Sequence, residues 1–148
     1  MSVVKAVFFD LFETLISEYA GGVRKVDRAG RNDAARIGLE HGVYRREWSA
    51  RQRQRMTGEF PGYMAVMRHI LEGQNVPIDE RILQEMHEER IAEKAAAFTG
   101  IDPEVIVLLD ELRRENVAIG LISNCTEEEV NAWESSGLAP YFDTVLFS

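Results

Sequence analysis

The sequence predicts an α/β protein with a three-layer core around a parallel sheet and an all-helical unit inserted after the first strand. Two apolar stretches, residues 3–9 and 117–122, end abruptly in polar side chains. The residues that follow them are Asp10 in the first case and Ser123-Asn124 in the second. Between these stretches, the pattern from residue 23 to residue 98 is helical. Strands that alternate with long helical segments are typical of parallel sheets.

The first strand is expected at residues 3–9, where β-branched and aromatic residues follow one another almost without interruption. Such continuous apolarity is typical of a strand that is covered on both faces. In open α/β sheets, ligands bind beyond the carboxyl ends of the strands. Asp10 is therefore either a cap of the strand or a residue with a chemical role. Gly21-Gly22 marks a flexible hinge, near which we place the boundary between core and insertion.

The insertion is predicted to form a small bundle of helices, each with apolar residues at helical spacing. Asn32 or Asp33 can cap the first helix, and Asp79 can cap the last. The expected helices cover residues 32–42, 45–56, 61–71 and 80–97. The predicted division of the chain is therefore 1–20 together with 99–148 for the core, and 21–98 for a helical cap.

The core resumes at Asp102-Pro103, an N-cap followed by proline at the first helical position. Asn116 can adopt the left-handed conformation that ends this helix. Thr126 and Glu129 have the spacing of a capping box for a further helix. The second and third strands are expected at residues 117–122 and 144–147. If the strands are parallel neighbours, their polar ends share one edge of the sheet.

Composition narrows the classes of function. A net charge of -8 argues against non-specific binding of nucleic acid, which needs a basic surface. No apolar run approaches the roughly 20 residues that span a bilayer, and the N-terminus lacks the pattern of a signal peptide. The single cysteine, Cys125, excludes an internal disulfide and suits a reducing cytosol. We therefore expect a cytoplasmic protein that binds neither nucleic acid nor membranes.

Three segments of the sequence resemble motifs of one family. The stretch from Phe9 to Leu15, Phe-Asp-Leu-Phe-Glu-Thr-Leu, resembles the first motif of the haloacid dehalogenase (HAD) superfamily, and Leu121-Ile122-Ser123-Asn124 resembles the second. Residues 141–148 resemble the run-up to the third motif. The resemblance implies a Rossmann-like core with a helical cap. It also implies hydrolysis of a small anionic substrate, either a phosphate ester or a 2-haloacid, through a covalent intermediate on Asp10.

The resemblance assigns roles to individual residues, each with a structural alternative. Thr14 is expected to fix the loop after the nucleophile, although it has the character of an ordinary turn hydroxyl. Ser123 and Asn124 are expected to bind substrate oxygens, although both suit a turn before a helix. The backbone amides of Leu11 and Phe12 are expected to face the substrate. The predicted catalytic set is Asp10, Thr14, Ser123 and Asn124.

Phe12 departs from the family pattern. Phosphatases of the family carry a second aspartate there as general acid and base, which contributes about 10²- to 10⁴-fold to the rate. Dehalogenases of the family place an aromatic residue there, and a departing halide needs no proton. A dehalogenase also needs a cap arginine for the substrate carboxylate. Arg51, on the basic helix after Trp48, is the expected residue, with a solvated helix face as the alternative.

The third-motif lysine and the fourth-motif acidic residues of the family are expected beyond Ser148, so the resemblance predicts a truncated domain that is inactive or very slow by itself. A phosphatase would need Mg²⁺, for which Asp10 and the Phe12 carbonyl make a poor site; a dehalogenase would need no cofactor. The open sheet edge predicts self-association. The alternative function is a degenerate module that binds a ligand or partner without turnover.

Overall fold

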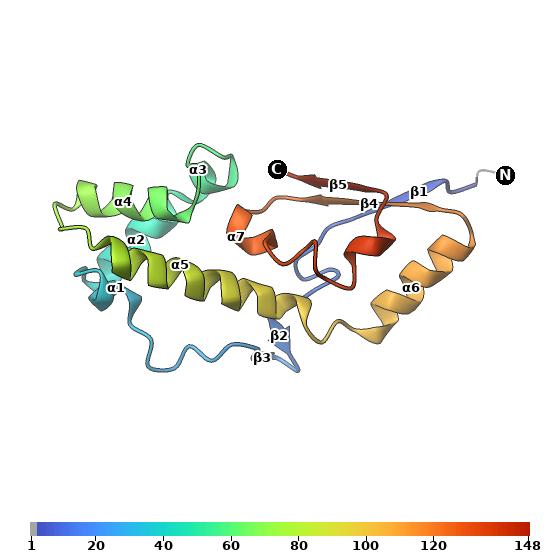
Figure 1. The fold of residues 1–148 in the computed structure, drawn as a ribbon, viewed down its shortest axis with the longest axis horizontal. Coiled ribbons are helices and arrows are strands. Elements are labelled where there is room, and N and C mark those ends of the chain that lie inside the picture. Colours follow the sequence, from blue (N-terminus) through green and yellow to red (C-terminus); the bar gives the residue numbers. More distant parts are fainter. Residues whose placement is uncertain (1–2) are drawn as a thin grey trace.

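Three parallel strands form the core sheet in the computed structural model, which describes residues 3–148 (Figure 1). The pairs Phe9–Leu121 and Ser123–Phe147 set the register, and all three carboxyl ends point to the same edge. The α/β class and the parallel arrangement that the sequence predicts are therefore confirmed. In spatial order the strands are β1 (Ala6–Phe9), β4 (Ala118–Ser123) and β5 (Thr144–Phe147).

One face of this sheet is covered. Alternate residues of a strand point to opposite faces, and Ile119 and Leu121 of β4 pack in a buried cluster with Leu109 and Trp133. Leu109 belongs to α6 (Pro103–Arg114), whose N-cap is Asp102 as predicted. Burial of such side chains contributes about 1.5–3 kcal/mol each, which makes this cluster the main source of stability for the core. The remaining elements near it are α7 (Glu127–Val130) and η2 (Ala139–Tyr141).

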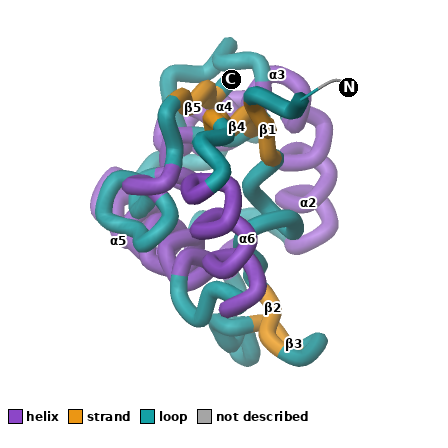
Figure 2. The backbone as a smooth tube through the Cα atoms, turned by 90° about the vertical axis from the view of Figure 1, so that its right-hand side faces the viewer, coloured by secondary structure: helices purple, strands orange, loops and turns teal. Residues whose placement is uncertain are grey.

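The other face of the sheet is open in the described part of the chain. Phe8, Ile122 and Leu146 expose 57%, 48% and 56% of their surface there. The Phe8 ring lies over Gly120, where an added Cβ would come within 2.4 Å of the ring. Continuous apolarity predicts cover on both faces, and residues 3–148 supply it on one. Figure 1 shows the helices α6 and α7 on a single side of the sheet, and Figure 2 shows the same for α6.

A short hairpin, β2 (Tyr19–Ala20) and β3 (Val23–Arg24), leads from the core to the helical part. Gly21 and Gly22 form its turn with φ of 58° and 80°, a region that glycine occupies without steric cost. The glycine pair that the sequence marks as a hinge is therefore a tight turn.

The helical part has its own buried cluster, separate from that of the core. Ile37, Met67, Ile70 and Leu83 are among its members, with at most 7% of their surface exposed. Asn32 and Asp79 cap the first and last helices through their side chains, as predicted. The helices are α1 (Asp33–Arg36), α2 (His41–Ala50), α3 (Gln52–Met56), α4 (Tyr63–Gly73) and α5 (Glu80–Ala95), which continues into η1 (Ala96–Phe98).

Three helices differ from the prediction. The first helix ends at Arg36 instead of continuing to Gly42. The basic helix begins at His41, because the Glu40 carboxylate accepts hydrogen bonds from the amides of Gly42 and Val43 at 2.9 and 3.0 Å. It is interrupted at Arg51, where ψ is 8°. The helix after Thr126 is a single turn, Glu127–Val130.

The predicted division into core and cap stays a prediction. Most members of one buried cluster lie in the predicted core, and the members of the other lie in the predicted cap. Ala97 and Phe98, which the division assigns to the cap, pack in the core cluster. No helix within residues 3–148 combines the length and the apolarity required to cross a membrane.

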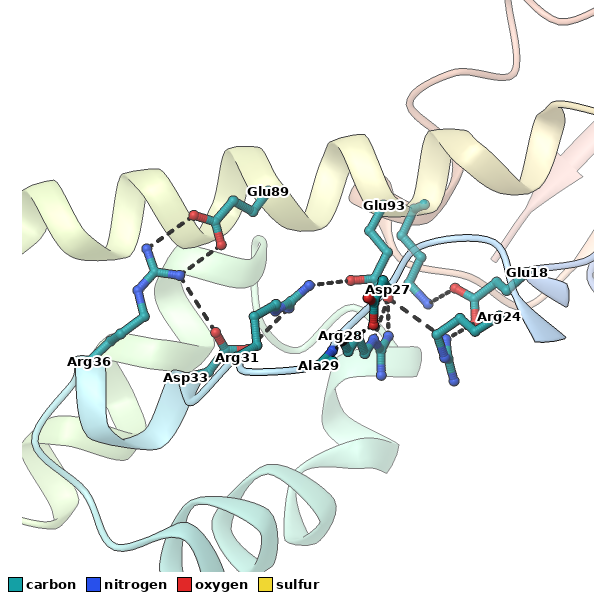
Figure 3. A network of polar contacts seen from close by, with 11 residues as sticks. Glu18, Arg24, Asp27, Arg28, Ala29, Arg31, Asp33, Arg36, Glu89 and Glu93 are labelled. Atoms are coloured by element: carbon teal, nitrogen blue, oxygen red, sulfur yellow. Dashed lines mark hydrogen bonds and ion pairs between the residues drawn. The ribbon is translucent and has the colours of Figure 1, made fainter.

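An ion-pair belt ties the irregular segment after β3 to α5 (Figure 3). At its centre is Glu93, only 6% exposed, which pairs with Arg28 and, at 2.7 Å, with Arg31. Arg36 pairs with Glu89, also at 2.7 Å. The further members of this ion-pair belt are Glu18, Arg24, Asp33 and Lys94.

Candidate active site at the carboxyl ends of the strands

Asp10 directly follows β1 and is exposed at the carboxyl edge of the sheet. The loop after it folds around the carbonyl of Leu11, which accepts hydrogen bonds from the amides of Thr14, Leu15 and Ile16 at 3.3, 2.9 and 3.2 Å. The Leu11 side chain is fully buried and anchors the loop in the core cluster. An accessible carboxylate is therefore held on a fixed turn, while Leu11 itself exposes no surface.

Glu13 has a structural role in this loop. Its φ of 57° lies in the left-handed region that favours glycine. The carboxylate accepts hydrogen bonds from the Ser17 hydroxyl at 2.8 Å and from the Glu18 amide at 3.3 Å, which offset the unfavourable conformation. This carboxylate is thus occupied within its own loop, and Asp10 is the free acidic group of the turn.

Ser123 and Asn124 end β4 next to the last residue of β5. The Ser123 carbonyl accepts a hydrogen bond from the Ser148 amide at 3.0 Å, and the Ser123 residue is 2% exposed. The Asn124 side-chain oxygen accepts a hydrogen bond from the Ser148 hydroxyl. These contacts orient the Ser-Asn pair at the edge, with Asn124 engaged on the β5 side.

The structure brings the expected catalytic residues to one edge. One step beyond the Phe9–Leu121 pair, Asp10 lies opposite Ile122, the residue before Ser123. Thr14 is exposed, and among residues 3–148 its hydroxyl has no hydrogen-bond partner; its amide takes part in the turn instead.

The Phe12 side chain is partly buried against the core cluster. It therefore anchors the loop, and this position supplies no acid beside Asp10. Within residues 3–148, no group of three or more His, Cys, Asp or Glu side chains is arranged to hold a metal ion. One carboxylate from Asp10 and one carbonyl from Phe12 do not fit a Mg²⁺ site held by protein ligands.

A cavity of about 190 Å³ lies beside this edge, between the helical part and the core. Figure 1 shows why: the carboxyl ends of β4 and β5 point towards α3 and α4. The cavity wall on the side of the helical part consists of the aromatic rings of Trp48, Phe60 and Tyr63. The core side comes from the turn after β4, residues 125–128, and from Ser148.

The arginine that reaches the cavity differs from the expected one. Arg51 is directed into the cap, where its Nη1 lies 2.7 Å from Glu47 and its Nε donates to His69 at 2.9 Å. Arg55 lines the cavity, with its guanidinium carbon 3.9 Å from the centroid of the Trp48 ring. A substrate role for Arg51 stays untested, and the geometry favours Arg55 for a charge in the cavity.

A buried ion pair joins the long helix α5 to the turn after β4. Arg90 donates to Glu128 at 2.9 Å, and the Glu128 side chain is 4% exposed. Burial opposes ionisation of this carboxyl, but the hydrogen bond and charge of Arg90 outweigh it and lower the pKa of Glu128. The pair fixes the position of the cavity wall. Sequence reasoning missed it, because its members are far apart in the chain.

Cys125, also at the cavity, does not suit a nucleophilic role. Burial, together with the neighbouring charge of Glu129, raises the pKa of its thiol to about 11. The thiol donates to the Ser123 carbonyl at 3.7 Å. A protonated thiol is a poor nucleophile, so Cys125 has the properties of a small buried residue.

Comparisons with known proteins bear on the fold. No family model matches the sequence, and no curated protein does. A solved HAD family enzyme from Bacteroides thetaiotaomicron matches with a TM-score of 0.57 and 15% identity, over 97% of this chain and 68% of its own. An L-2-haloacid dehalogenase matches with a TM-score of 0.42 and 20% identity, over 99% and 64%. The first likeness shows that this chain has a HAD-type fold.

Proposed function

We propose that this chain, which has a HAD-type fold, is a hydrolase that attacks a small anionic substrate with the carboxylate of Asp10. The observation that carries the proposal is the position of Asp10: exposed, at the edge where Ser123 and Asn124 end the neighbouring strand. Within residues 3–148 no side chain forms an ion pair or hydrogen bond with it. A free carboxylate beside hydroxyl and amide groups can act as a nucleophile on an anion that those groups hold.

The proposed reaction has two steps. An Asp10 oxygen forms a bond to phosphorus or carbon while the bond to the leaving group breaks, and the leaving group departs with the electron pair. Water then hydrolyses the covalent intermediate and restores the carboxylate. Ser123 and Asn124 would hold the substrate oxygens, and the Leu11 and Phe12 amides would assist. Thr14 would keep the loop in place.

The leaving group separates the two substrate classes. The alkoxide that leaves a phosphate ester needs a proton, which Phe12 cannot supply. A halide leaves without one, so Phe12 is compatible with a 2-haloacid. For a phosphate ester, Mg²⁺ would need ligands additional to Asp10 and the Phe12 carbonyl. No step is therefore assigned to a metal.

A release assay with two substrates tests the proposal. Halide release from 2-chloropropionate without Mg²⁺ would support the dehalogenase class, and phosphate release from p-nitrophenyl phosphate with Mg²⁺ the phosphatase class. Retention of either activity in the Asp10→Asn variant would contradict the proposal. Binding of both compounds without any turnover would favour the alternative, a degenerate module that binds its ligand unchanged.

Self-association is a separate proposal. The outer sides of β1 and β5 have no strand paired with them among residues 3–148, and an open edge can pair with another chain. Light scattering over a concentration series should show a rise in mass. A constant monomer mass at high concentration would contradict this part. Cytoplasmic location likewise stays a proposal.

A further inference from the structure

We propose that the cavity between α2, α4 and the turn after β4 binds an aromatic carboxylate, with the ring among the aromatic side chains and the carboxylate on Arg55. The inference rests on the proposed function, because it names the substrate class that the same edge of the sheet would receive. The cavity has aromatic walls and one arginine, Arg55, whose charge the described residues leave unpaired.

The walls of the cavity suit one aromatic ring. Trp48 and Tyr63 meet edge to face, with centroids 5.8 Å apart and an angle of 62° between the rings. Phe60 and Val66 add further apolar surface. Aromatic rings pack favourably in such edge-to-face arrangements. An engineered apolar cavity of about 150 Å³ in another protein holds benzene, so 190 Å³ has room for a ring with a small substituent.

Arg55 supplies a charge without a partner. Within residues 3–148 no carboxylate lies within 4 Å of its guanidinium, and its buried Nε has no hydrogen-bond partner. The guanidinium stacks on Trp48 instead, and its Nη2 donates to the Trp48 carbonyl at 3.4 Å. Burial and the repulsion from Arg90 lower the pKa of Arg55, so the present surroundings disfavour its charge. A ligand carboxylate would supply the missing acceptor, since guanidinium and carboxylate groups pair in a bidentate manner.

Two neighbouring arginines of the helical part do have carboxylate partners. Arg51 pairs with Glu47, and Arg90 pairs with Glu128. Arg90 also lies over Trp48, at 5.2 Å, but its charge is already neutralised. Arg55 is thus the cavity arginine with free hydrogen-bonding capacity, and an anion from outside the described chain fits it.

The position of the cavity connects it to the proposed chemistry. Its core wall begins at Cys125, the residue after Asn124, and includes Ser148, which donates to Asn124. A ring packed against the cavity side of Trp48 and Tyr63 would leave the opposite end of the ligand at the edge where Ser123 and Asn124 lie. The reacting group would point out of the cavity towards Asp10.

Isothermal titration calorimetry with phenylacetate tests this inference. Phenylacetate has ring and carboxylate but no leaving group, so the result does not depend on whether turnover occurs. We expect it to bind at least tenfold more tightly than acetate or benzyl alcohol, which each carry one half of the ligand, since charge-assisted hydrogen bonds contribute roughly that factor. Equal affinities for the three compounds would overturn the inference.

Arg55→Met should weaken phenylacetate binding about tenfold and leave benzyl alcohol binding unchanged. The matched control is Arg53→Met, which removes an exposed arginine from the same helix and should bind like the parent protein. If Arg55→Met does not fold by circular dichroism, Arg55→Gln serves in its place, because it removes the charge and keeps a polar end. Unchanged phenylacetate binding in the folded variant would overturn the role of Arg55.

Trp48 reports the location of the ligand. Phenylacetate should quench tryptophan fluorescence, and Trp48→Phe should remove the quenching, because the other tryptophan, Trp133, is 2% exposed in the core cluster. Quenching that persists in Trp48→Phe would place the ligand elsewhere and contradict the proposed site.

Discussion

The ion-pair belt along α5 and the edge around Asp10 use charge in opposite ways. In the belt, each carboxylate has an arginine or lysine beside it, and Glu93 alone contacts Arg24, Arg28 and Arg31 (Figure 3). At the edge, Asp10 has no partner within residues 3–148. Paired and buried charges hold an irregular segment in place, whereas an exposed and unpaired charge is available to a ligand. The difference separates structural from functional charges.

The largest effect is expected for the unpaired charge. Asp10→Asn should lower turnover at least ~10³-fold, because loss of a nucleophile removes the covalent route. Its melting temperature should stay close to that of the parent protein, because the side chain is exposed. Steady-state rates and a thermal scan check both parts. Glu13→Gln, a neighbouring carboxylate that bonds within its own loop, is the control and should retain turnover.

A gain of activity is expected from Phe12→Asp. The change adds a carboxyl group near Asp10, which can donate the proton that Phe12 cannot supply. Phosphate release in the presence of Mg²⁺ should therefore rise at least ~10-fold. Phe12→Leu keeps an apolar anchor and should give no gain. Stability should fall in the aspartate variant, because the ring packs against the core cluster. A folded Phe12→Asp variant without any gain would favour a 2-haloacid or binding alone.

A smaller effect, on stability, is expected in the belt. Glu93→Gln should reduce the free energy of unfolding by about 2–3 kcal/mol, because it leaves several arginines without their buried partner. Denaturant titration measures this. Glu88→Gln, at an exposed position of the same helix, should change it by less than about 0.5 kcal/mol. Equal losses of unfolding free energy in both variants would show that the ion-pair belt does not contribute to stability.

Acid dependence sharpens the same comparison. Burial opposes ionisation of Glu93, but the hydrogen bonds and charges of Arg28 and Arg31 lower its pKa below the ordinary 4.5. A lowered pKa means that this stabilisation is present above about pH 4.5 and is lost as the pH falls through the folded value. The acid-induced loss of stability should therefore be smaller in Glu93→Gln than in the parent protein. A loss of the same size in both would contradict the assignment.

Local signals in the sequence predicted the frame of the fold. The third strand lies at residues 144–147 as expected, Asp79 and Asp102 cap their helices, and Asn116 adopts a φ of 55°. Each of these depends on a few neighbouring residues. The shared edge of Asp10, Ser123 and Asn124 could also be predicted, because parallel strands place their carboxyl ends together.

Features that depend on distant contacts were not predictable. Arg51 and Arg55 lie four residues apart on one basic stretch, and only the break at Arg51 and the pair with Glu47 decide which of them reaches the cavity. Glu93 is buried with 6% of its surface exposed because Arg28 and Arg31, more than 60 residues earlier in the chain, pair with it. Continuous apolarity in the first strand could not show which face the described chain leaves open.

Trapping of the intermediate tests the central claim most directly. The protein would be mixed with the better of the two substrates, quenched in acid during turnover, digested, and analysed by peptide mass spectrometry. The account predicts an added phosphoryl or carboxyalkyl mass on the peptide that contains Asp10, at that residue. A modified residue elsewhere, or turnover with Asp10 unmodified at every time point, would contradict it.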